Sequence, residues 1–244
     1  MKYTGEEKKI PLTPISIGRL LLLLLLPIIA FGLALYPILL VNFFIIQYLN
    51  FGIIINLLII SLLLVINLLL FTFTAMLSTA FFVNIFFLKY KEGEYGKSLK
   101  NRTAFRYISY FTLKHPVYKL LDIFNISPLK SLYLKLIGCK IGKNVFLAGG
   151  EYLIDPCALE IGENTMIGGK TIITSHLAED KFIVKKVKIG KNCLIGGASL
   201  ILPGVIIEDN VVVGARSLII KDQILKKGKT YAGIPAKEIK KKVK

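Results

Sequence analysis

The chain has 244 residues, of which 54% are hydrophobic and only 19% are charged, and its formal net charge is +17. This apolar content is too high for a purely soluble protein of such a length. It is also unevenly distributed, because no Asp, Glu, Lys or Arg occurs between Leu20 and Leu88. The composition therefore excludes an ordinary soluble domain and predicts a membrane segment near the N-terminus.

Two apolar segments, roughly residues 17–46 and 53–87, fill the uncharged region. Each is longer than the ~20 residues that a helix needs to cross a bilayer. A cleaved signal peptide would be shorter and would not be followed at once by a second apolar segment. We therefore expect a two-helix transmembrane hairpin, and Pro27 and Pro37 are tolerable inside its first helix.

Basic residues flank this hairpin, whereas the connection between its two helices is uncharged. They are Lys2, Lys8, Lys9 and Arg19 before it, and Lys89, Lys91, Lys97, Lys100 and Arg102 after it. The positive-inside rule places both termini, and everything after Leu88, in the cytoplasm. The three cysteines, an odd number without paired spacing, are typical of a reducing compartment.

Residues 89–140 contain 11 basic and three acidic residues. Between Thr103 and Leu136 the basic residues alternate with apolar and aromatic ones. This pattern is typical of amphipathic helices that lie on the surface of a membrane with anionic lipids. We expect membrane lipid as a partner and no nucleic acid, because no segment is similar to a nucleic-acid-binding module. His115 is assigned no role.

The last hundred residues repeat with a period of six. Every sixth position from Ile189 to Leu225 is aliphatic, Tyr231 continues the series, and small residues recur four positions after the first five. Each such hexad is a short strand plus a corner, and three hexads complete one coil of a parallel β-helix.

Asparagines mark successive coils at Asn144, Asn164, Asn192 and Asn210, where their tolerance of positive φ suits a tight corner. The interval from Asn164 to Asn192 is 28 residues, about ten more than the 18 residues of a three-hexad coil. We therefore expect a loop that leaves one corner of the second coil and carries His176, Glu179 and Asp180.

The segments "IGGASLILPGVIIEDNVVVGARSLIIKD" and "YAGIPAKEIK" resemble the CoA-side coils and the C-terminal signature of the hexapeptide-repeat acyltransferases. That family has a left-handed parallel β-helix, so the expected fold class is all-β. The handedness is implied by the resemblance alone, since ordinary crossovers are right-handed. The paired apolar segments and "SHLAED" also resemble membrane-embedded modules of peptide-synthetase-like proteins.

The resemblance implies acetyl-CoA or another acyl-CoA as co-substrate, no metal, a homotrimer and a histidine general base. His176 is then the expected base, and Glu179 or Asp180 would orient it or bind the acceptor. Backbone N–H groups of Gly196 and Gly197 are candidates for stabilising the oxyanion. The expected cofactor-binding residues are Gly196, Gly197, Ala198, Gly214, Ala215, Ile220, Lys221, Gly233, Pro235 and Lys237.

Three alternatives stay open. A non-catalytic scaffold would need the same glycines, serines and isoleucines, because the coil itself requires them. An aminoacyl condensation would use a protein-bound thioester in place of CoA. A zinc enzyme of the γ-carbonic-anhydrase type needs three histidines, so His176 would have to meet its copies from two other chains.

We expect a basic cytoplasmic N-terminus (1–16), the transmembrane hairpin (17–88), a basic amphipathic linker (89–137), a hexapeptide-repeat acyltransferase domain (138–236) and a basic tail (237–244). The expected function is a membrane-anchored, acyl-CoA-dependent O- or N-acyltransferase, in particular an acetyltransferase. It would modify a glycan or a lipid-linked acceptor at the cytoplasmic membrane face.

Overall fold

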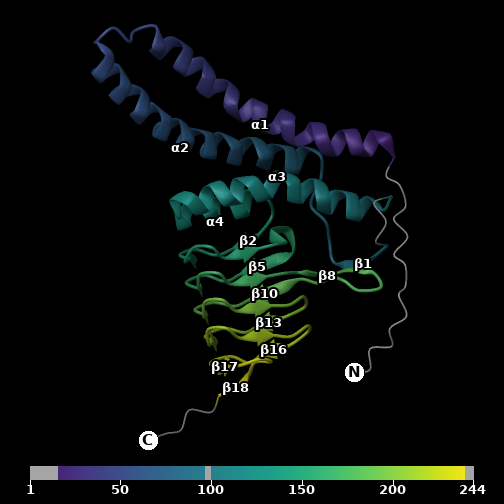
Figure 1. Cartoon of the computed structure of the whole chain (residues 1–244). Coiled ribbons are helices and arrows are strands. Elements are labelled where there is room, and N and C mark those ends of the chain that lie inside the picture. The colour runs from purple at the N-terminus through teal and green to yellow at the C-terminus, as the bar shows by residue number, and fades with distance from the viewer. Residues whose placement is uncertain (1–15, 97–99, 240–244) are drawn as a thin grey trace, which may run out of the picture.

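A computed structural model describes residues 16–96 and 100–239. Lys2, Lys8, Lys9 and Lys97, which entered the prediction of orientation, lie outside the described residues, as do segments 1–15 and 240–244. Two long helices form a hairpin, two further helices lie beneath it, and a column of short strands extends away from them (Figure 1).

The hairpin consists of α1 (Ile17–Ile46) and α2 (Ile53–Ile85). Both helices are long and apolar enough to cross a membrane. Their contact follows the pattern of membrane helices, in which small residues allow close approach and polar side chains bond across the interface. Ala30 and Ala75 are fully buried, and the Ser78 hydroxyl donates to the Ala30 carbonyl at 2.7 Å.

Helices α3 (Arg102–Phe124) and α4 (Ser127–Leu136) confirm that the basic linker is helical. They are sandwiched between the hairpin and the β-helix (Figure 1). Lys130 is fully buried and forms ion pairs with Asp122 of α3 and with Glu151 of the first coil. Through these contacts the linker connects the hairpin to the β-helix. The alternation of basic and apolar residues did not predict this packing.

The β-helix is built from three sheets with parallel strands, and its last strand pairs antiparallel with its neighbour. The first sheet contains β2 (Lys140–Ile141), β5 (Leu159–Ile161), β10 (Val187–Ile189), β13 (Ile206–Ile207) and β16 (Ile224–Leu225). The second contains β3 (Phe146–Leu147), β6 (Met166–Ile167), β11 (Leu194–Ile195), β14 (Val212–Val213), β17 (Thr230–Ala232) and β18 (Lys237–Glu238). The third contains β4 (Tyr152–Leu153), β7 (Ile172–Ile173), β12 (Leu200–Ile201) and β15 (Leu218–Ile219).

The six-residue repeat is confirmed at both kinds of position. Every predicted inward residue from Ile189 to Tyr231 is buried, and so are the small residues between them. The four marker asparagines occupy stacked corners with φ between 52° and 59°. Side-chain ladders of aliphatic residues therefore fill the column and fix its register.

The interruption of the repeat forms a β-hairpin of β8 (His176–Ala178) and β9 (Phe182–Val184). A short strand of the linker, β1 (Gly93–Tyr95), pairs antiparallel with β9 and completes a three-stranded sheet. Lys181 and Glu94 form an exposed ion pair of 2.8 Å across this contact. The loop that carries His176 is thus held by the segment that follows the apolar hairpin.

Candidate functional site

His176 begins β8 directly after the third strand of its coil, at the corner between the third and first sheets. Its side chain is 17% exposed. The ring lies between Tyr107 of α3 and Phe182 of β9, with centroid distances of 4.7 Å and 5.3 Å. The linker and the loop therefore build the environment of this imidazole together.

Asp155 holds the imidazole from the coil below. The Nδ1 atom of His176 lies 2.8 Å and 2.9 Å from the two carboxylate oxygens of Asp155, whose side chain is fully buried. The carboxylate also accepts hydrogen bonds from the Tyr90 hydroxyl and from the Ser175 N–H. Burial alone would raise the pKa of Asp155, but the bonds from His176, Tyr90 and Ser175 outweigh it and lower that pKa. The carboxylate stays ionised and fixes the ring.

The Nε2 atom of His176 lies 3.3 Å from the hydroxyl of Tyr107. Burial, with smaller effects of Asp155 and Tyr152, raises the pKa of Tyr107 to about 12, so the phenol stays protonated. A protonated phenol donates to Nε2, while Nδ1 donates to Asp155. Both contacts select the tautomer whose Nε2 can accept a proton.

Glu179 and Asp180, predicted to assist His176, lie exposed at the tip of the loop. Glu179 contacts Lys221 at 3.6 Å instead of the imidazole. The carboxylate that contacts the imidazole is therefore Asp155, and a role of Glu179 or Asp180 in binding the acceptor stays a prediction.

The predicted cofactor residues lie at two different corners. The corner between the second and third sheets holds Gly196, Gly197, Ala198, Gly214 and Ala215. The N–H of Gly233, in the turn before β18, donates to the Ser217 hydroxyl at 3.3 Å. Ile220 and Lys221 lie at the corner that carries His176. Pro235 and Lys237 are exposed beyond the last coil.

The corner glycines are explained by the coil itself. A Cβ on Gly196 would lie 2.3 Å from the Ala215 nitrogen of the next coil. The N–H of Gly196 also donates to the Val213 carbonyl at 2.8 Å, which leaves Gly197 as the remaining oxyanion candidate. The glycines are therefore compatible with a CoA site, but the coil would need them without one.

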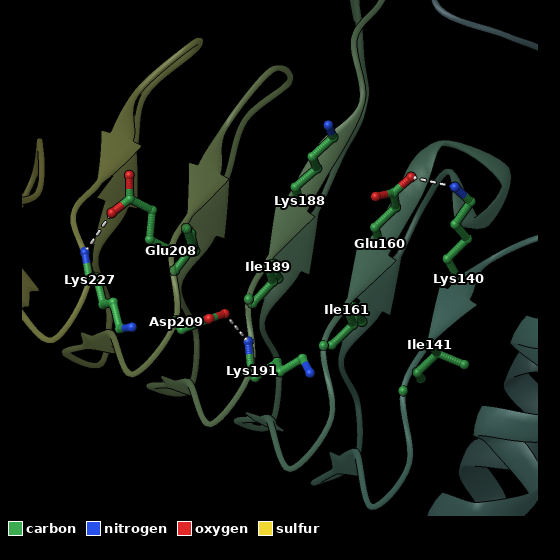
Figure 2. A pocket seen from close by; sticks show the side chains of 14 residues that line it. Lys140, Ile141, Glu160, Ile161, Lys188, Ile189, Lys191, Glu208, Asp209 and Lys227 are labelled. Atoms are coloured by element: carbon green, nitrogen blue, oxygen red, sulfur yellow. Dashed lines mark hydrogen bonds and ion pairs between the residues drawn. The ribbon is translucent and has the colours of Figure 1, made fainter.

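A shallow groove of about 740 Å³ runs over the first sheet (Figure 2). Its charges largely compensate one another. Lys140 pairs with Glu160 at 3.0 Å, and the backbone N–H of Lys227 donates to Glu208 at 2.9 Å. None of the predicted site residues lines this groove, and we assign it no role.

Asp155 was missed by the sequence analysis although a signal for it existed. The strands before the two residues pair in register, Leu153 with Ile173, so Asp155 stacks under Ser175 and beside His176. Corner residues one coil apart are neighbours in any β-helix. A search for acidic residues one coil before the histidine would have found it, whereas Tyr90 and Tyr107 carried no comparable signal.

Comparisons with known proteins agree with this architecture. Residues 186–217 match the family model described as the hexapeptide repeat of succinyl-transferase. The chain is 36% identical over 94 residues to YvoF of Bacillus subtilis, which is named as an acetyltransferase, and 30% identical over 108 residues to galactoside O-acetyltransferase of Escherichia coli. These matches cover 37% and 41% of this chain, and 55% and 52% of those relatives.

A third relative is the delta-poly-L-ornithine synthetase of Acinetobacter baumannii. It is 27% identical over 105 residues, which are 43% of this chain and 8% of the synthetase. Among solved structures, a maltose O-acetyltransferase from Clostridium difficile is similar with a TM-score of 0.45 and 20% identity, covering 61% of this chain and 92% of that one. The chain thus spans about half of the curated acetyltransferases that it matches.

Proposed function

We propose that this chain, a member of the hexapeptide-repeat acyltransferase family, transfers an acyl group from CoA to a hydroxyl or amine. The observation that carries the proposal is the His176–Asp155 pair. A buried carboxylate fixes Nδ1 of an imidazole whose side chain is 17% exposed, and the Tyr107 hydroxyl lies 3.3 Å from Nε2, which leaves Nε2 as the nitrogen that can act as a general base. An inert scaffold would not need such an arrangement.

The reaction follows from this geometry. The acceptor O–H or N–H donates its proton to Nε2 of His176 while the oxygen or nitrogen attacks the thioester carbon. The oxyanion that forms is stabilised by backbone N–H groups, for which Gly197 is the candidate. The carbon–sulfur bond then breaks, and the imidazolium returns the proton to the CoA thiolate. Asp155 stabilises the imidazolium without taking the proton itself.

A homotrimer would bring the two halves of the predicted cofactor site together. Within one chain, the glycine corner and the His176 corner lie on opposite sides of the third sheet. The outer face of the second sheet presents an apolar stripe, which comprises Phe146, Met166, Leu194 and Val212, each between 37% and 48% exposed. Such a stripe suits the contact with a second copy, and a closed ring buries it in every chain.

The acceptor is proposed from chemistry and from location. Galactoside O-acetyltransferase is named for a sugar acceptor, which supports a glycan. Helices α1 and α2, if they span the membrane with the basic linker on the cytoplasmic side, hold His176 close to the lipid surface. A lipid-linked glycan would meet both conditions. Acetyl is the acyl group proposed, in line with the acetyltransferases that the chain matches.

Aminoacyl condensation is the second candidate, because 43% of this chain matches the ornithine polymer synthetase at 27% identity. The two functions differ in the thioester that they consume. We would incubate the full-length protein in detergent with [14C]acetyl-CoA and a saccharide acceptor series, and measure CoA release. Acceptor-dependent release supports the proposal. The proposal is contradicted if no acceptor of the series increases the release of CoA, or if acetyl-CoA yields no CoA under any condition.

A further inference from the structure

A row of partly exposed rings leads away from His176 along α3. Tyr107, Phe111 and His115 follow one another at intervals of four residues, so they share one face of the helix. Neighbouring centroids lie 6.3 Å and 5.0 Å apart. Tyr152 of β4 closes the row, with its hydroxyl 3.0 Å from Nδ1 of His115. We call these four residues the ring row.

The end of the ring row remote from His176 is positively charged. Lys119, one further turn along α3, is exposed, and its Nζ lies 5.8 Å from the centroid of Tyr152. Lys114 lies fully buried beneath the row, 5.0 Å from the same ring. Its ammonium donates to the carbonyls of Leu153 and Ile154, and none of the ion pairs among the described residues includes it. Its charge therefore adds to that of Lys119.

His115 contributes no charge of its own to this surface near pH 7. Burial, together with Lys114 and Lys119, lowers the pKa of His115 below its usual value. The imidazole is therefore neutral, and it stacks almost parallel on Phe111 with an interplanar angle of 14°. The row thus offers flat apolar rings at its centre, a proton acceptor at one end and a cation at the other.

We propose that the ring row binds the acceptor, and that the acceptor is a saccharide joined through a phosphate to a lipid. Sugar rings present apolar C–H faces that pack on aromatic rings, and phosphate is complementary to Lys119. From Tyr107 to Lys119 the helix rises about 18 Å, a span of a few sugar rings. The lipid end is consistent with the position of α3, which packs on both α1 and α2 (Figure 1).

This inference rests on the proposed transfer, because it takes Nε2 of His176 as the point where the accepting hydroxyl must lie. A phospholipid headgroup alone would satisfy the lysines but would leave the aligned rings without a purpose. The ring row therefore favours a ligand with several rings between its phosphate and its reactive group.

Binding can be tested without catalysis. The chain contains no tryptophan, so Phe111→Trp places a single tryptophan in the ring row, and its emission can be excited apart from that of the tyrosines. We would reconstitute the full-length variant in phosphatidylcholine nanodiscs and titrate it with dodecyl glucosyl phosphate, a phosphodiester, or with neutral dodecyl glucoside. No acyl-CoA is added. We expect a saturable change in emission and about tenfold tighter binding of the phosphodiester.

The matched pair of variants is Lys119→Gln and Lys135→Gln, made in the Phe111→Trp background. Lys135 is an exposed lysine on α4 and lies outside the ring row. Lys119→Gln should remove most of the preference for the phosphodiester, and Lys135→Gln should keep it. Equal affinities for the two probes, or equal losses in the two variants, would overturn the proposal.

Nanodiscs that contain phosphatidylglycerol provide the last arm. If this lipid alone reproduces the change in emission, the surface binds headgroups and the proposal is wrong. Binding of the phosphodiester by a protein that releases no CoA from any acyl-CoA would instead refute the proposed transfer and leave the binding surface standing. The two proposals therefore fail separately.

Discussion

Asp155→Asn tests how His176 is oriented. An asparagine side chain has nearly the same shape as aspartate, but it can turn its amide N–H₂ toward Nδ1 of His176. Nδ1 would then have to accept a hydrogen bond instead of donating one. The imidazole proton would move to Nε2, and Nε2 could no longer take the proton of the acceptor. We therefore expect kcat/KM to fall about 10²–10⁴-fold, or about 3–5 kcal/mol of transition-state stabilisation.

The same substitution has a structural cost that must be separated from the catalytic one. The Tyr90 hydroxyl and the Ser175 N–H both donate to the Asp155 carboxylate, and an amide group can satisfy only part of this set. A buried donor without its partner costs about 1–3 kcal/mol of folding free energy. The thermal midpoint in detergent and the affinity for CoA should therefore be measured beside the rate.

Glu179→Gln and Asp180→Asn are the matched controls, since each removes one exposed carboxylate of the same loop. We expect both to keep most of the activity, measured as CoA release. Near-normal activity of Asp155→Asn, or an equal loss of activity in either control variant, would show that Asp155 does not orient the general base.

Three further predictions follow from individual contacts. Tyr107→Phe keeps the ring but removes the hydroxyl that competes for Nε2, so KM for the acceptor should fall about two- to tenfold; an unchanged KM would show that the phenol does not compete. Burial lowers the pKa of Lys114 from 10.5 to about 8. Below pH 8 the buried ammonium is charged and destabilises the folded state, and between pH 8 and 10.5 the folded protein releases this proton while the unfolded chain keeps it, so the penalty shrinks. The stability of the wild type relative to Lys114→Met should therefore rise by about 2–3 kcal/mol from pH 7 to pH 10 in thermal unfolding, and a constant difference would contradict the buried charge. Leu194→Asp, in the apolar stripe, should convert trimers to monomers in mass photometry, whereas Ile224→Asp on the outer face of the first sheet should not; trimers in both variants would exclude the stripe as the interface.

The sequence predicted those parts of the fold that depend on composition and on a local repeat. The hexad frame predicted the inward residues and the corners, because each coil repeats the same local geometry. The long uncharged segments predicted α1 with the same bounds, and α2 to within two residues. The excursion after Thr174 was also predicted from the interval between the marker asparagines.

The site itself was predicted only in part. His176 could be singled out because it interrupts the repeat, but its partners come from distant segments: Asp155 lies 21 residues before it and Tyr107 lies 69 residues before it. Asp155 meets His176 because successive coils stack in register, so a comparison of corner residues one coil apart could have found it. Tyr107 reaches the site only because α3 docks on the β-helix, and that tertiary contact has no periodic signal. For the same reason the burial of Lys114 and Lys130 in the packing of the linker could not be predicted from its alternation of basic and apolar residues.

The most direct test of the whole account is acyl transfer by the intact protein in its own membrane. Membranes that contain the wild type or His176→Ala at equal amounts would be incubated with [14C]acetyl-CoA, and the label in extracted lipids and glycans would be measured with the products identified by mass spectrometry. We predict a labelled, lipid-linked saccharide with the wild type and a loss of at least about 100-fold with His176→Ala. Equal labelling by the two proteins would contradict the assignment of His176 as the general base.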